Sequence, residues 1–153
     1  MDAGQQYPVI MGSCKFSATS SDQLNFRMWD YQYLSQYQVS SGANKDLYYA
    51  QTGTPTNSWH HVAMVSSGSA YSFYLDGVNL TPLSSIYSTG PGDWWAETPN
   101  RDNYTIGGTL VDNIYYVWDG MIDDVRVYPI ALTTNEVQTL MSYTHPTNNL
   151  ETR

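Results

Sequence analysis

The fold is decided by Tyr71-Ser72-Phe73-Tyr74-Leu75-Asp76-Gly77-Val78-Asn79-Leu80. Large apolar side chains occupy every second position of its first half, which is the period of a β-strand. Asp76-Gly77 then interrupts the run, and the glycine supplies the positive φ that a two-residue hairpin turn requires. Apolar residues return directly after the turn. The stretch therefore predicts a β-hairpin.

The sequence before this hairpin has the same character. Leu24, Phe26 and Met28 recur with a period of two, as expected of a strand with one buried face. Trp59–Val65 is apolar enough to form a strand buried on much of both faces. Ser67-Gly68-Ser69 is a turn signal that would join this strand to the hairpin. The first half of the chain therefore predicts strands and turns.

The sequence after the hairpin repeats these signals. Asp119-Gly120 separates Tyr115–Trp118 from Met121–Tyr128, and we expect a second tight hairpin there. Thr81–Asn103 is richer in Pro, Gly and Ser, and we expect a long loop. Short strands separated by turn signals are typical of an all-β sandwich or barrel.

One helix is expected near the C-terminus. Thr133 and Glu136 have the spacing of a capping box, and an apolar stripe ending at Met141 follows. Residues 142–153 are expected to form a frayed tail. The predicted fold class is therefore an all-β, two-layer antiparallel sandwich with one short C-terminal helix, formed by residues 1–153 as a single domain.

The composition excludes several classes of function. The 153 residues carry 14 acidic and six basic side chains, for a net charge of −8, whereas nucleic-acid binding needs a basic surface. Cys14 is the only cysteine, so neither an intrachain disulfide nor a cysteine-rich zinc site can form. No apolar run approaches the roughly 20 residues of a membrane span. The first residues also lack the features of a secretory signal peptide.

Four segments, taken in order, resemble a known family. They are Trp59–Ala63, Tyr74–Gly77, Thr105–Gly108 and Gly120–Tyr128. This ordered set resembles the laminin-G-like jelly-roll family of the concanavalin-A-like lectin/glucanase superfamily, over about residues 6–141. The resemblance implies a jelly-roll sandwich.

The resemblance also implies that the chain lacks one or two strands that usually precede Tyr7–Ile10. The missing strands normally pair with the last strand, here Met121–Tyr128. An open edge of this kind promotes association. We therefore expect one of three arrangements: residues 1–11 cover the edge, a second copy pairs with it as a homo-oligomer, or a partner chain donates a strand.

Catalytic chemistry is not expected. Glycosidases of this superfamily place paired carboxylates on one strand, and no glutamate here has a second acid two residues away on a strand. His60 and His61 are neighbours, so a strand would direct their rings to opposite faces. The chain is therefore predicted not to be an enzyme, with a glycoside hydrolase fragment as an alternative.

Calcium is the one cofactor that the resemblance suggests. Asp123 matches a position that resembles a structural calcium ligand in related jelly-roll hydrolases, although the usual partner ligands belong to the absent N-terminal stretch. Calcium needs six to eight oxygen ligands. The alternative is that Asp123 accepts hydrogen bonds in a β-bulge at Asp123-Asp124.

Aromatic residues in and after the long loop indicate glycan binding. Sugars stack their C–H faces on aromatic rings, and acids, amides and arginine bind their hydroxyl groups. The candidate ligand-binding residues are Asp93, Trp94, Trp95, Arg101, Asp102, Tyr115, Tyr116 and Trp118. We expect one of Trp94 and Trp95 to be buried and the other exposed. Trp29 and Tyr74 form a second, weaker aromatic set on a sheet face.

The sequence therefore favours a non-catalytic carbohydrate-binding or adhesion module at a cell or virion surface, with a glycan or cell-surface polysaccharide as its partner. The expected location is extracellular or surface-associated. The main alternative is a structural interaction domain that assembles by strand pairing or oligomer contacts without a small ligand.

Overall fold

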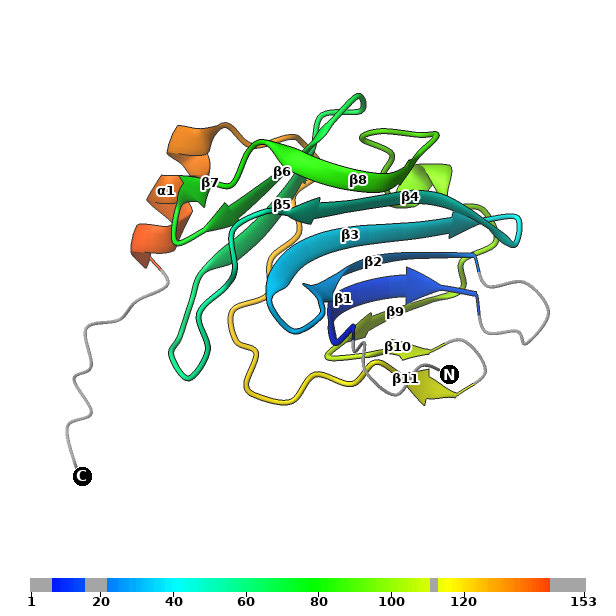
Figure 1. Cartoon of the computed structure of the whole chain (residues 1–153), viewed down its shortest axis with the longest axis horizontal. Helices are drawn as coiled ribbons and strands as arrows, with labels where there is room; N and C mark the ends of the chain where they lie inside the picture. Colours follow the sequence, from blue (N-terminus) through cyan, green and yellow to red (C-terminus); the bar gives the residue numbers. More distant parts are fainter. Residues whose placement is uncertain (1–6, 16–21, 111–112, 144–153) are drawn as a thin grey trace.

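The structure is a computed structural model that describes residues 7–15, 22–110 and 113–143. Two antiparallel sheets face each other as a jelly-roll sandwich (Figure 1). The larger sheet has six strands in the order β8-β4-β3-β2-β1-β9. Their bounds are β1 Val9–Cys14, β2 Gln23–Trp29, β3 Tyr33–Ser40, β4 Ala43–Ala50, β8 Leu83–Ser88 and β9 Asn103–Ile106.

The smaller sheet has three strands in the order β5-β6-β7, and β10 and β11 form a separate two-stranded sheet. Their bounds are β5 Val62–Ser66, β6 Tyr71–Leu75, β7 Val78–Asn79, β10 Thr109–Leu110 and β11 Ile114–Tyr115. A short 3₁₀ helix, η1, spans Trp95–Glu97, and the α-helix α1 spans Thr134–Tyr143.

The core lies between the larger and the smaller sheet, as the alternation of apolar residues in the sequence predicts. Leu24, Phe26 and Met28 of β2 are all buried. The ring of Phe26 approaches that of Phe73 from β6, with 6.1 Å between the centroids. Burying such side chains on both inner faces is the main favourable contribution to folding.

The local signals of the hairpin and the helix are confirmed. Asp76 and Gly77 form the turn between β6 and β7, with φ of 49° and 74°. At the start of α1, the Thr133 hydroxyl accepts a hydrogen bond from the Glu136 amide at 3.3 Å. The Glu136 carboxylate accepts one from the Thr133 amide at 2.7 Å, which completes the capping box.

Three expectations are wrong. Thr81–Asn103 is not simply a loop, because it contains β8 and η1. Asp119-Gly120 is not a hairpin turn, because Met121–Tyr128 pairs with no described strand. The strand expected over Trp59–Val65 and buried on both faces is present only as β5, Val62–Ser66, and Trp59 is 54% exposed.

The missing hairpin at Asp119-Gly120 and the exposure of Trp59 have a common physical cause. A strand is stabilised by hydrogen bonds to a neighbouring strand, and a core residue needs packed atoms on every side. Residues 7–10 do not cover Met121–Tyr128, because β1 lies in the larger sheet between β2 and β9. Among the described residues, therefore, no strand pairs with the outer edge of β5 or with Met121–Tyr128.

Candidate functional site

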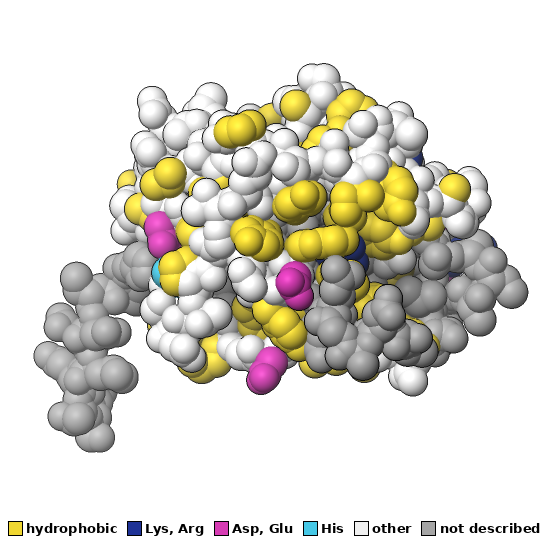
Figure 2. All heavy atoms as spheres, viewed as in Figure 1, with side chains coloured by type: hydrophobic (Ala, Val, Ile, Leu, Met, Phe, Trp, Pro, Cys, Tyr) yellow, Lys and Arg dark blue, Asp and Glu magenta, His cyan; other side chains and the backbone are white. Residues whose placement is uncertain are grey.

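The outer face of the larger sheet carries a continuous group of aromatic rings. We call it the aromatic face, and it consists of Tyr7, Trp29, Tyr33, Tyr37, Tyr49 and Tyr116. The strand register builds it, because Trp29 lies opposite Tyr33 and Ser35 lies opposite Tyr49. Figure 2 shows hydrophobic side chains gathered over β2, β3 and β4.

The rings of this face contact one another. Trp29 and Tyr49 are stacked, with centroids 5.9 Å apart and planes 16° apart. Tyr7 lies 5.0 Å from Trp29 and 6.0 Å from Tyr116. Trp29 and Tyr49 are each half-buried, so each ring keeps an accessible part. Such a group offers flat apolar surface with hydroxyl groups at its edges.

Arg27 lies beneath the aromatic face and is only 4% exposed. Its guanidinium carbon is 4.6 Å from the centroid of Tyr7 and 4.2 Å from that of Tyr37. Both distances are within the range of a cation–π interaction. Burial lowers the pKa of Arg27 to about 10, so the side chain is still charged at neutral pH.

Arg27 is not matched by an acid in the described part of the chain. None of the ion pairs found there includes it, and its Nε atom has no hydrogen-bond partner. Burial also raises the pKa of Tyr37, whose hydroxyl donates to Asn44 Oδ1 at 2.6 Å. The aromatic face therefore combines neutral rings with one positive charge in a strongly acidic chain.

The loop tryptophans lie elsewhere, and the expectation of one buried and one exposed ring is wrong. Trp94 and Trp95 are both half-buried, with ring centroids 4.8 Å apart. Trp95 also meets Tyr104 edge-on at 5.3 Å. Both tryptophans, together with Trp118, line the space between the two sheets. They fix the loop to the sandwich.

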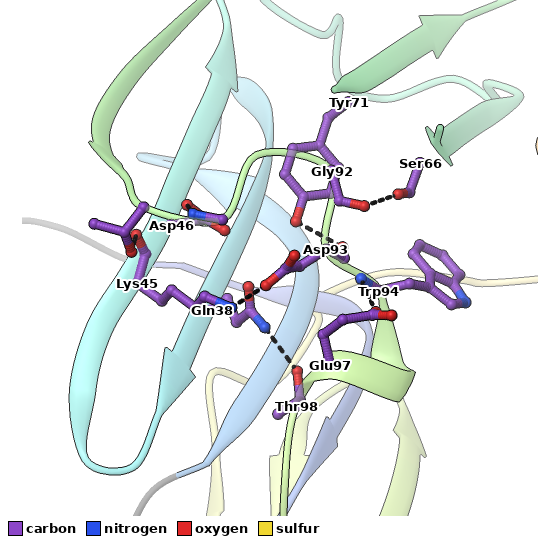
Figure 3. A network of polar contacts seen from close by, with 12 residues as sticks. Gln38, Lys45, Asp46, Ser66, Tyr71, Gly92, Asp93, Trp94, Glu97 and Thr98 are labelled. Carbon is purple, nitrogen blue, oxygen red and sulfur yellow. Dashed lines mark hydrogen bonds and ion pairs between the residues drawn. The ribbon is translucent and has the colours of Figure 1, made fainter. Parts of the chain in front are cut away.

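The polar residues of this loop are engaged within the protein (Figure 3). The Asp93 carboxylate pairs with Lys45, and the backbone carbonyl of Asp93 accepts a hydrogen bond from the Tyr71 hydroxyl at 2.6 Å. The Glu97 carboxylate accepts from the Trp94 amide at 2.7 Å. These bonds hold the loop in place.

Of the remaining candidate residues, some form hydrogen bonds at residues 98–104 and others lie at or beside the aromatic face. Arg101 donates to the Thr98 carbonyl at 2.8 Å and to the Tyr104 hydroxyl at 2.9 Å. Asp102 accepts from Asn103 at 3.0 Å. In contrast, Tyr116 belongs to the aromatic face.

Tyr115 lies beside Tyr116, with 6.3 Å between the ring centroids. Of the weaker set, Trp29 also belongs to the aromatic face. Tyr74 is buried and makes a hydroxyl contact of 3.2 Å with Thr134.

Asp123 makes a local hydrogen bond. It is exposed, and its carboxylate accepts from the Asp124 amide at 2.8 Å. Asp124 has a φ of 50°, and its carboxylate forms two hydrogen bonds of 2.8 Å with Arg126. Among the described residues, no group of three acids, histidines or cysteines lies together. Calcium binding at Asp123 stays a prediction.

The structure contains a series of side-chain hydrogen bonds, through Ser58, His60 and Asp76, that the sequence analysis did not predict. The Ser58 hydroxyl lies 2.7 Å from His60 Nε2, and His60 Nδ1 lies 2.7 Å from the Asp76 carboxylate. The other oxygen of Asp76 accepts from the His61 amide at 3.0 Å. These bonds tie residues 58–61 to the hairpin turn. Sequence spacing gave no sign of them, because they depend on the register of β5 and β6.

The two facing antiparallel sheets define a jelly-roll domain. Residues 2–138 match the concanavalin A-like lectin/glucanases superfamily, in its laminin G form, and the chain belongs to this family. Comparison with curated protein sequences finds no match.

Two similar solved structures are of the Ruminococcus gnavus IT-sialidase CBM40, a carbohydrate-binding module. The form bound to α2,3-sialyllactose has a TM-score of 0.73, and the other form has a TM-score of 0.67. Each is 12% identical to the chain, with 92% of this chain and 77% of the other covered. In the described residues, no helix is long and apolar enough to cross a membrane.

Proposed function

We propose that the protein is a non-catalytic carbohydrate-binding module that binds acidic oligosaccharides on its aromatic face. The observation that carries the proposal is the continuous group of half-buried and exposed rings above the buried charge of Arg27. The rings offer stacking surfaces for sugar C–H groups. The guanidinium makes the face attractive to a carboxylate.

The neighbouring structures support this ligand class. A carbohydrate-binding module with the same fold is bound to α2,3-sialyllactose, a sugar that carries one carboxylate. In this chain, Arg27 is the basic side chain that lies among the aromatic rings. A module of this kind acts where glycans are displayed, so we place the protein outside the cell or on a cell or virion surface, with attachment as its role.

A calorimetric titration with α2,3-sialyllactose and with lactose tests the proposal. We expect binding of sialyllactose and weaker binding of lactose, which lacks the acidic sugar. Trp29→Ala should weaken sialyllactose binding by about 1–2 kcal/mol, roughly 5- to 30-fold in Kd. Trp59→Ala is the matched control, because this exposed tryptophan lies outside the aromatic face, and it should leave Kd unchanged.

The tryptophan loop is the competing surface. If sugar binds between the sheets instead, Trp94→Ala will weaken binding and Trp29→Ala will not. The proposal is wrong in that case, and also if neither sugar binds.

A further inference from the structure

Two backbone edges have no partner among the described residues: one side of β5 in the smaller sheet, and residues 119–132, which belong to no described sheet. β5 is the end strand of its sheet and pairs only with β6. Residues 119–132 form no backbone–backbone hydrogen bond in the described part of the chain. In Figure 1 they run as a yellow-to-orange trace without an arrow, between β11 and α1. Unpaired strand edges are the groups to which an added strand binds.

Both edges border the same cavity. Its volume is about 1340 Å³, and its lining includes Val62–Ser66, residues 118–132 and the inward side chains of β2. Val62, Met64 and Ile122 are packed against the core but only partly buried. Met121 is 74% exposed and Val127 is 49% exposed. Much apolar surface is therefore left accessible where the core should be closed.

Buried indole nitrogens along this cavity also lack partners. Neither Trp95 Nε1 nor Trp118 Nε1 donates a hydrogen bond to any described residue. A buried donor without an acceptor destabilises the folded state. The backbone carbonyls of an inserted strand would provide acceptors of the required kind.

The acidic residues around the cavity favour a positively charged strand as its occupant. Its lining includes the acids Glu97, Asp119 and Asp123, while Arg126 is paired with Asp124. A second copy of this chain carries a net charge of −8 and would bring more negative charge to this rim. A strand with Lys or Arg at its outward positions is complementary.

We propose that a strand of a partner chain, with apolar residues at alternate positions and Lys or Arg between them, inserts between β5 and residues 121–128. Its apolar residues complete the core over β2, and its backbone pairs with the open edge of β5. Residues 121–128 then become the strand that their sequence indicates. This inference is independent of glycan binding, because the aromatic face lies on the opposite side of the larger sheet.

A synthetic peptide tests the inference on the whole chain. The probe is a ten-residue peptide that alternates valine with lysine or threonine. One control peptide has the same composition with its valines grouped, and another has glutamate in place of lysine. Binding is measured by calorimetry, and hydrogen exchange follows the amides of Val62–Ser66 and Met121–Tyr128.

We expect only the alternating basic peptide to bind and to slow exchange at both edges by tenfold or more. Val125→Pro should abolish this protection, because proline cannot donate to a ladder. Val125→Ala is the matched control, since it keeps the amide and should keep most of the binding. Neither variant should alter sialyllactose binding.

Three results would overturn the inference. The first is that the peptide leaves exchange unchanged at both edges. The second is that the monomeric chain alone already protects residues 121–128, so that its own residues close the edge. The third is that light scattering finds a dimer whose edges are protected without peptide, which would make a second copy the occupant.

Discussion

Arg27 is buried among aromatic rings, and its charge is the feature that distinguishes an acidic from a neutral sugar. Replacing it by methionine keeps a long unbranched side chain beneath Tyr7 and Tyr37 but removes the charge. We expect Arg27→Met to weaken sialyllactose binding about fivefold, as a partly screened charge at several ångströms would. Lactose binding should not change.

The melting temperature separates this effect from a loss of folding. Replacing a buried charge by an apolar side chain of similar volume is often neutral for stability. We therefore expect Arg27→Met to melt close to the unaltered protein. Equal losses of affinity for sialyllactose and lactose would show that Arg27 supports the rings rather than attracting the carboxylate.

Asp46 is the buried acid of the polar network in Figure 3. Burial is the main cause that raises its pKa above the ordinary value of 3.8, against a hydrogen bond from the Gly90 amide. A raised carboxyl pKa means that the folded state binds the proton more tightly. Its contribution to stability is therefore full below pH 3.8 and is lost as the pH rises through the folded-state pKa.

Asp46→Asn should therefore raise the melting temperature at pH 7, because asparagine keeps an acceptor for Gly90 without the buried charge. The difference should vanish below about pH 3.8, where Asp46 is protonated in both states. Thermal melts across this pH range measure it, with the exposed Asp119→Asn as the control. A lower melting temperature for Asp46→Asn at pH 7 would show that the carboxylate is well paired.

At the level of single elements, the capping box of α1 gives a further prediction. Thr133→Ala removes the hydroxyl that accepts from the Glu136 amide and should destabilise the protein by about 1 kcal/mol. Urea unfolding measures the change, and Thr133→Ser, which keeps the hydroxyl, should recover most of the stability. Equal losses for Ser and Ala would contradict the role of the cap.

Elements with local signals were predicted well from the sequence. The Asp76-Gly77 turn and the Thr133 cap depend on residues within one turn of each other. The conformation of Met121–Tyr128 was not predicted correctly, because a segment with an alternating pattern forms a strand only beside another strand. The prediction named a strand, and the sheet has no neighbour for it among the described residues.

The candidate site was only partly predictable for the same reason. Tyr116 and Trp29 were named, but in separate sets, and Tyr7 and Arg27 were not recognised as part of a site. These residues meet through the register of β2 with β3 and through the place of β1 beside β2. Loop composition drew attention to Trp94 and Trp95, whose packing between the sheets depends on contacts distant in sequence.

At the scale of the whole molecule, the two faces of the larger sheet have different roles. Its inner face supports the core and lines the cavity that the described residues leave beside β5. Its outer face displays the aromatic rings. Because the larger sheet lies between them, the proposed sugar site and the proposed strand site should respond separately to substitution.

An NMR titration of the chain with α2,3-sialyllactose locates the bound sugar without any substitution. The account predicts that the largest amide shifts fall on β2, β3 and β4, around Trp29, Tyr33 and Tyr49. Lactose should give smaller shifts at the same positions. Shifts centred on residues 88–102, or none at saturating sugar, would contradict the account.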